Sequence, residues 1–90
     1  MIQLANLMDG RSFPDSGNLL YQDMTRLLDV NKTVSIDLTG VISIPTMFLN
    51  ASIGRAVDHY GVEKIKQSVV FYHITKGQAE RLKEYFSRLS

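Results

Sequence analysis

Residues 34–54, VSIDLTGVISIPTMFLNASIG, constrain the fold of this 90-residue chain more than any other segment. The segment opens with apolar residues at every second position and reaches Asp37. It then passes a short loop that contains Gly40 and continues from Thr46 with apolar residues at helical spacing. This order predicts a β-strand that leads through a tight loop into an α-helix. In α/β domains, a loop of this kind is the usual place for a functional site.

The remainder of the chain repeats this arrangement, so three strand–helix units are expected. Apolar and β-branched runs predict strands at residues 1–7, 33–38 and 68–74. A polar loop is expected over residues 9–17, which contain two glycines and a proline. Apolar residues at helical spacing predict helices from about residue 18, over residues 46–60 and from residue 75 onward.

Two of the predicted helix ends carry recognisable signals. Gly61 is expected to end the second helix, because glycine adopts the left-handed conformation without steric cost. Thr75 and Gln78 have the spacing of a capping box, in which each side chain bonds the backbone N–H of the other residue. The buried face of the third helix is predicted to consist of Ala79, Leu82, Phe86 and Leu89.

The alternation of strands and helices predicts one α/β domain over residues 1–90, with a small βαβαβα fold. Strands that are separated by helices pair in parallel, with right-handed crossovers. We expect a three-stranded parallel sheet in the order two–one–three, with the first strand in the middle and the helices covering the sheet. The third strand would then leave an apolar open edge, and such an edge favours pairing with a second chain. A homodimer or a complex with another protein is therefore expected.

Composition excludes several classes of function. The formal net charge is +1 without a basic block, which gives no support for nucleic-acid binding through a charged surface. The chain has no cysteine, so it has no disulfide, thiolate metal site or thiol nucleophile. We find neither a signal-peptide pattern nor an apolar run long enough to span a bilayer, so a cytoplasmic domain away from the membrane is expected.

No residues at catalytic or metal-binding spacing are recognisable. His59 and His73 fall on different predicted elements and lack a third ligand in the sequence. The serines have no general base nearby in the sequence, and no glycine-rich phosphate loop occurs. The sequence therefore predicts a protein that is not an enzyme and that holds no metal or cofactor.

The loop after the second strand is the candidate site. Asp37 is expected to accept hydrogen bonds from loop N–H groups, and Gly40 to allow the loop to turn. Thr46 is interpreted as an N-cap. Met47 and Phe48 lie outside the apolar face of the second helix, so they either pack on the first loop or form an exposed apolar contact. The residues predicted to bind a partner are Ser43, Thr46, Met47, Phe48, Asn50 and Arg55.

Several short motifs extend along most of the chain. They are Asp37 at the end of a strand, Gly40-Val41, Ser43-Ile44, Phe48, Gly54 in the following helix, and Gly10-Arg11 with Gly17 earlier. Together they resemble the STAS-like family of domains of unknown function. The resemblance implies a shortened relative of the sulfate-transporter and anti-sigma-factor-antagonist domains, acting in bacterial-type signalling.

The antagonist relatives suggest both a partner and a modification. Their equivalent loop reads roughly Asp-Ser-Ser-Gly, and a kinase with a histidine-kinase-like ATPase fold phosphorylates a serine there. This chain instead reads Pro45-Thr46-Met47-Phe48, with Met47 at the position of the modified serine and Thr46 at the first serine. A phosphorylated residue could then only be Thr46, or a residue reached by a one-position shift of the alignment.

The leading hypothesis is a non-enzymatic cytosolic regulatory module. It docks a protein partner, for which the resemblance suggests a histidine-kinase-like ATPase, through the loop between the second strand and the second helix. One alternative is a switch that is phosphorylated at Thr46. The other is a small-molecule or nucleotide-binding domain that uses the N-terminus of the second helix.

Overall fold

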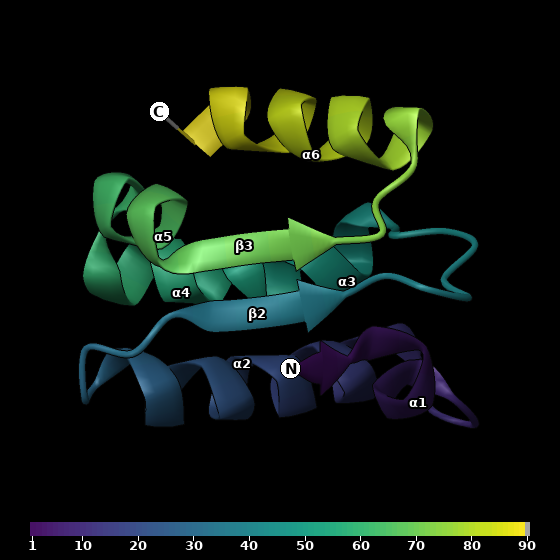
Figure 1. Cartoon of the computed structure of the whole chain (residues 1–90), viewed down its shortest axis with the longest axis horizontal. Helices are drawn as coiled ribbons and strands as arrows, with labels where there is room; N and C mark the ends of the chain where they lie inside the picture. The colour runs from purple at the N-terminus through teal and green to yellow at the C-terminus, as the bar shows by residue number, and fades with distance from the viewer. Residues whose placement is uncertain (90) are drawn as a thin grey trace.

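The computed structural model describes residues 1–89, which form a short α/β domain (Figure 1). In chain order its elements are β1 (Ile2–Gln3), α1 (Leu4–Met8), α2 (Phe13–Leu28), β2 (Val34–Asp37), α3 (Thr46–Ala51), α4 (Ile53–Tyr60), α5 (Val62–Ser68), β3 (Val69–Tyr72) and α6 (Lys76–Leu89). Within this described part of the chain, no helix is both long enough and apolar enough to cross a membrane.

The sheet has three parallel strands, as predicted, but the predicted order was wrong. The order is β1–β2–β3, and Ile36 of β2 lies between Ile2 of β1 and Phe71 of β3. β2 takes the middle because it supplies the most deeply buried side chains, with Val34 and Ile36 fully buried. β1 is too short to form a full ladder on both of its sides.

The first strand was predicted too long, and α1 was not predicted. The first predicted helix corresponds to α2, which begins earlier than expected. Only Ile2–Gln3 are extended, and α1 follows at once because Leu4, Leu7 and Met8 have helical spacing and turn toward the core. α2 begins at Phe13, inside the predicted loop. The side chain of Ser12 caps it by accepting a hydrogen bond from the Asp15 N–H at 3.2 Å.

The second predicted helix is divided at Ser52. This residue is fully buried, and its backbone (φ −120°, ψ −85°) leaves the helical region. Its hydroxyl donates to the Phe48 carbonyl oxygen at 2.8 Å, a bond of the kind that bends helices. Gly61, with φ +91°, ends α4 as predicted, but the chain then forms α5, a helix that the sequence analysis missed.

The core lies between the sheet and the helices behind it. Right-handed crossovers between strands in the order β1–β2–β3 place their helices on the same face of the sheet. Figure 1 shows α2, α3 and α4 behind the strands. Ser35 on the near face is half-buried, and Val70 and Tyr72 are exposed. The core side chains that fill the covered side include Leu20, Met24, Val34, Ile36, Phe48 and Leu49.

α6 lies beside β3 and completes the domain (Figure 1). Its predicted capping box is confirmed, because the Gln78 N–H donates to Thr75 Oγ1 at 3.1 Å and the Thr75 N–H donates to Gln78 Oε1 at 3.0 Å. The predicted buried face was only partly right. Leu82 is buried, Phe86 and Leu89 are half-buried, Ala79 is exposed, and Gln78 and Tyr85 are buried in addition.

Candidate functional site

The loop between β2 and α3 begins in a turn that Asp37 holds. One oxygen of its carboxylate accepts hydrogen bonds from the Thr39 N–H at 2.9 Å and from the Thr39 hydroxyl at 2.7 Å. This confirms the predicted bonding of Asp37 to the loop backbone. Gly40 follows with φ +81°, a conformation that side chains other than glycine rarely adopt, so its predicted role in the turn is confirmed as well.

His73 also contacts Asp37, at 2.9 Å between Nδ1 and the same carboxylate oxygen. The Thr39 N–H, and then the hydrogen bond with His73, hold the pKa of the Asp37 carboxyl well below its ordinary value. Because β2 and β3 are parallel neighbours, their carboxyl ends lie side by side, and this brings the two residues together. The pair was not predicted, because the predicted strand order put the first strand between β2 and β3.

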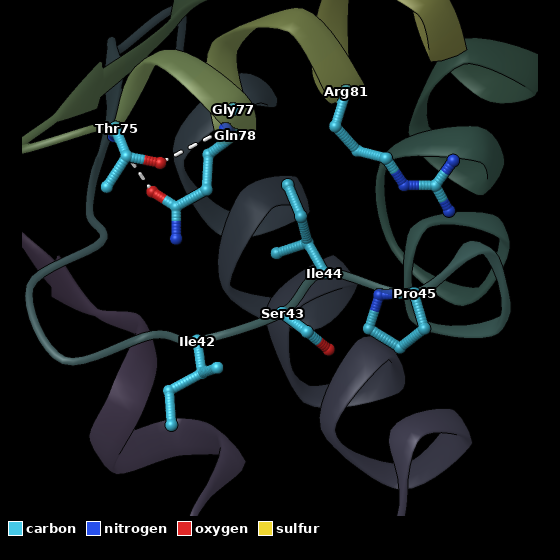
Figure 2. A pocket seen from close by; sticks show the side chains of 8 residues that line it. All are labelled: Ile42, Ser43, Ile44, Pro45, Thr75, Gly77, Gln78 and Arg81. Atoms are coloured by element: carbon cyan, nitrogen blue, oxygen red, sulfur yellow. Dashed lines mark hydrogen bonds between the residues drawn. The ribbon is translucent and has the colours of Figure 1, made fainter.

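The same loop is attached to α6 farther along. The Gln78 side-chain amide donates to the Val41 carbonyl oxygen at 2.7 Å, and the Ile44 side chain is buried. Figure 2 shows the Ile44 side chain pointing from the loop toward α6. Residues 42 and 43 are therefore presented by a loop that is fixed on both sides.

Exposed apolar side chains lie in and just after this loop, but Phe48 is not one of them. Ile42 is 95% exposed and Met47 is 59% exposed, whereas Phe48 is 1% exposed. Of the two alternatives for Phe48, the exposed contact was wrong, because its turn of α3 packs against α2 at Gly17, a residue of the predicted first loop. Phe48 is therefore not available to bind a partner. Ile42 was not among the residues predicted to bind a partner. The sequence feature that could have identified Ile42 is an apolar residue within a loop that has neither helical nor strand periodicity.

A hollow of about 440 Å³ separates residues 42–45 from the start of α6 (Figure 2). We call it the loop–α6 hollow. Neither Asp37, Thr39 nor Thr46 lines it, although the nucleotide-binding alternative places its ligand at the N-terminus of the second helix. The residues that line it are Ile42, Ser43, Ile44, Pro45, Thr75, Gly77, Gln78 and Arg81.

The chain matches the STAS-like domain of unknown function (DUF4325) over residues 16–79, which include β2, the loop and the start of α6. This chain belongs to that family. The predicted STAS-like resemblance is thereby confirmed, together with a small α/β fold that has a parallel sheet. Neither the curated proteins nor the solved structures include a match.

Thr46 of this STAS-like domain is not the N-cap that the sequence predicted. Pro45 occupies the N-cap position, and Thr46 is the first residue of α3. The exposed Thr46 hydroxyl instead accepts a hydrogen bond from an Arg81 guanidinium nitrogen at 2.6 Å. A cap was expected because threonine directly precedes the apolar run, but the helix begins one residue earlier than that assumption requires.

Asn50 and Arg55 are exposed on the STAS-like domain but lie against different helices. Asn50 accepts a hydrogen bond from the Tyr85 hydroxyl of α6 at 2.7 Å. The Arg55 guanidinium bonds the Asn18 side chain of α2 and lies 4.1 Å from the centre of the Tyr21 ring. Ser43 lies in the loop itself, so the predicted partner-binding residues do not share one patch.

The described residues of the STAS-like domain include no group of three or more His, Cys, Asp or Glu side chains placed to hold a metal ion. The described side chains that come nearest to a catalytic arrangement are those of Asp37 and His73, which contact each other. The hydroxyl beside this pair is that of Thr39, and it donates a hydrogen bond to the Asp37 carboxylate.

Proposed function

We propose that this STAS-like domain is a non-enzymatic regulatory module that docks a protein partner through the β2–α3 loop. The observation that carries the proposal is Ile42, an isoleucine with 95% of its surface exposed on a loop that is attached on both sides. Met47, at the start of α3, supplies a second exposed apolar side chain. These two residues replace Phe48 as the expected anchors.

The attachment of the loop supports docking because it lowers the entropy cost of binding. A loop that is already ordered loses little conformational freedom when a partner covers it. The Val41 carbonyl is bonded to α6 and Ile44 is buried, so the backbone that carries Ile42 is held on both sides. An apolar side chain that is covered by a partner, with polar groups around it, gives interfaces much of their energy.

The partner that we propose is a histidine-kinase-like ATPase, as the antagonist relatives suggest. The interaction would take place in the cytoplasm, without nucleic acid or membrane. A homodimer of the domain, which the sequence also led us to expect, is compatible with this interaction. The family description itself assigns no activity or partner.

The proposal is tested by calorimetric titration of the domain into a purified histidine-kinase-like ATPase domain from the same organism. Ile42→Ser and Met47→Ser should each weaken binding by about 1–3 kcal/mol, the usual range for an apolar anchor. Val30→Ser is the matched control, because Val30 is 60% exposed and lies in the turn after α2. Unchanged affinity of both loop variants would refute the docking surface. No binding of the wild type would eliminate the ATPase as partner.

A second candidate function is the switch at Thr46. The observation in its favour is that the Thr46 hydroxyl is exposed and faces the Arg81 guanidinium, where a phosphate would find a positive charge. The small-molecule alternative lacks comparable support. It places a ligand at the N-terminus of α3, but Thr46, the first residue of α3, does not line the loop–α6 hollow.

A further inference from the structure

We infer that the loop–α6 hollow receives an acidic side chain of the protein partner, with Arg81 as its counter-charge. This inference rests on the proposed docking function, since the hollow lies directly beside Ile42 and shares that residue with the docking surface. It adds the chemistry that would select a partner among proteins able to cover an apolar loop.

The composition of the loop–α6 hollow fits a carboxylate on a short aliphatic stem. Arg81 is the one charged residue among the eight that line it, so no acidic side chain competes for the guanidinium. Ile44 and Pro45 supply apolar walls, and Ser43 and Thr75 add hydroxyl-bearing side chains. A glutamate or aspartate can place its methylene groups against such walls and its oxygens at the cation.

Arg81 is oriented for this contact before any partner binds. Figure 2 shows its side chain leaving α6 on the side away from Ile42 and Thr75, and its guanidinium reaches Thr46 of α3. One guanidinium nitrogen donates to Thr46 Oγ1 at 2.6 Å, which fixes the planar group. A guanidinium has five N–H donors and binds a carboxylate through two of them, so the Thr46 bond leaves donors for an incoming acid.

Arg81 forms no ion pair in the described part of the chain, a property that it shares with Arg11 and Arg55 but not with Arg26 and Arg88. Arg26 bonds the carboxylate of Asp23, and Arg88 bonds that of Glu84. Over residues 1–89, the recorded partner of Arg81 is a neutral hydroxyl and no ion pair is formed. The side chain is also half-buried, and an ion pair with restricted access to water is stronger than a fully exposed one.

A single carboxylate balances the charge of the loop–α6 hollow. One guanidinium matches one negative charge, whereas a phosphate at neutral pH carries up to two and calls for further donors. The occupant that we assign is therefore an acidic side chain next to an aliphatic one, in a segment that covers both the hollow and Ile42.

The test uses a phage-displayed library of random linear peptides, selected on the immobilised full chain. The recovered peptides should be enriched in Glu or Asp beside an aliphatic residue. They should bind Arg81→Met roughly tenfold more weakly than the wild type, the equivalent of about 1.4 kcal/mol. Arg88→Met, on the same helix but outside the hollow, should bind them like the wild type. Selection on Arg81→Glu should instead enrich Lys or Arg. Circular dichroism of each variant verifies the fold.

The results distinguish a failure of this inference alone from a failure of both proposals. Peptides that lose affinity in Ile42→Ser but bind Arg81→Met normally, or that show no acidic enrichment, would overturn the assignment of the hollow and leave the docking surface standing. Peptides that are insensitive to both variants, or a selection that recovers none, would count against both proposals.

Discussion

Replacing Gly17 with alanine should destabilise the domain, even though alanine is the better helix former. Gly17 lies in α2 where α3 packs against it. A Cβ atom at position 17 would lie 2.6 Å from the Ala51 Cβ and 2.8 Å from the Phe48 carbonyl oxygen. Real Cβ atoms do not approach their neighbours so closely, and the Phe48 contact is to backbone. The added methyl group therefore requires α3 to move away from α2.

The expected magnitude is the balance of two effects. Glycine to alanine in a helix interior gains about 1 kcal/mol of stability. Overpacking a close contact costs about 1–3 kcal/mol. Because the clash here is double and involves backbone, the upper part of that range applies, which leaves a net loss of about 1–2 kcal/mol. Gly77 is the matched control, since a Cβ there meets nothing within 4 Å. Gly77→Ala should gain about 0.5–1 kcal/mol.

Urea unfolding followed by circular dichroism measures both variants against the wild type. The slope of the transition should be the same for all three proteins, so that the midpoints report stability. A Gly17→Ala variant as stable as the wild type would refute the close approach of α2 and α3. A Gly77→Ala variant with a similar loss would show that the effect does not come from the clash.

Three further predictions concern the site. Phe48→Ala should lower the free energy of unfolding by about 3–5 kcal/mol, because Phe48 is a core residue; Met47→Ala should change it by less than about 0.5 kcal/mol, and equal costs would contradict the assigned burial. Because the folded pKa of Asp37 is depressed, its contribution is present above the ordinary pKa and is lost as the pH falls from about 5 toward the folded value. Urea melts of Asp37→Asn should thus show a weaker acid dependence than the wild type, and parallel slopes would argue against it. Mass spectrometry of protein from its native host should find Thr46 unmodified, whereas substantial phosphate there would favour the switch.

Local chemistry in the sequence predicted local structure well. Alternation identified β2, since its two faces meet different surroundings. The capping box at Thr75 and the role of Gly61 depend on residues close together in the chain, so spacing alone was sufficient. The Asp37 turn was predictable for the same reason, because its main partner is two positions away.

Features that depend on packing could not be predicted in this way. The alternative that placed Phe48 on the surface assumed one continuous helix over residues 46–60. The buried Ser52 interrupts that helix and changes which residues face the core. The Asp37–His73 pair depends on β2 and β3 being neighbours. The exposure of Ile42 follows from a loop that is attached to α6 by Gln78, a contact between residues far apart in sequence.

The sheet order has a consequence for how the chain can be made. β2 pairs with β1, and β3 pairs with β2, so each strand pairs with the neighbouring strand in the sequence. The strands can therefore be added to the sheet in chain order, with β3 joining the free edge of β2 last. Short loops close at a lower entropy cost than long ones, so this route favours rapid folding. In the order two–one–three, by contrast, β3 would have had to find β1 across most of the chain.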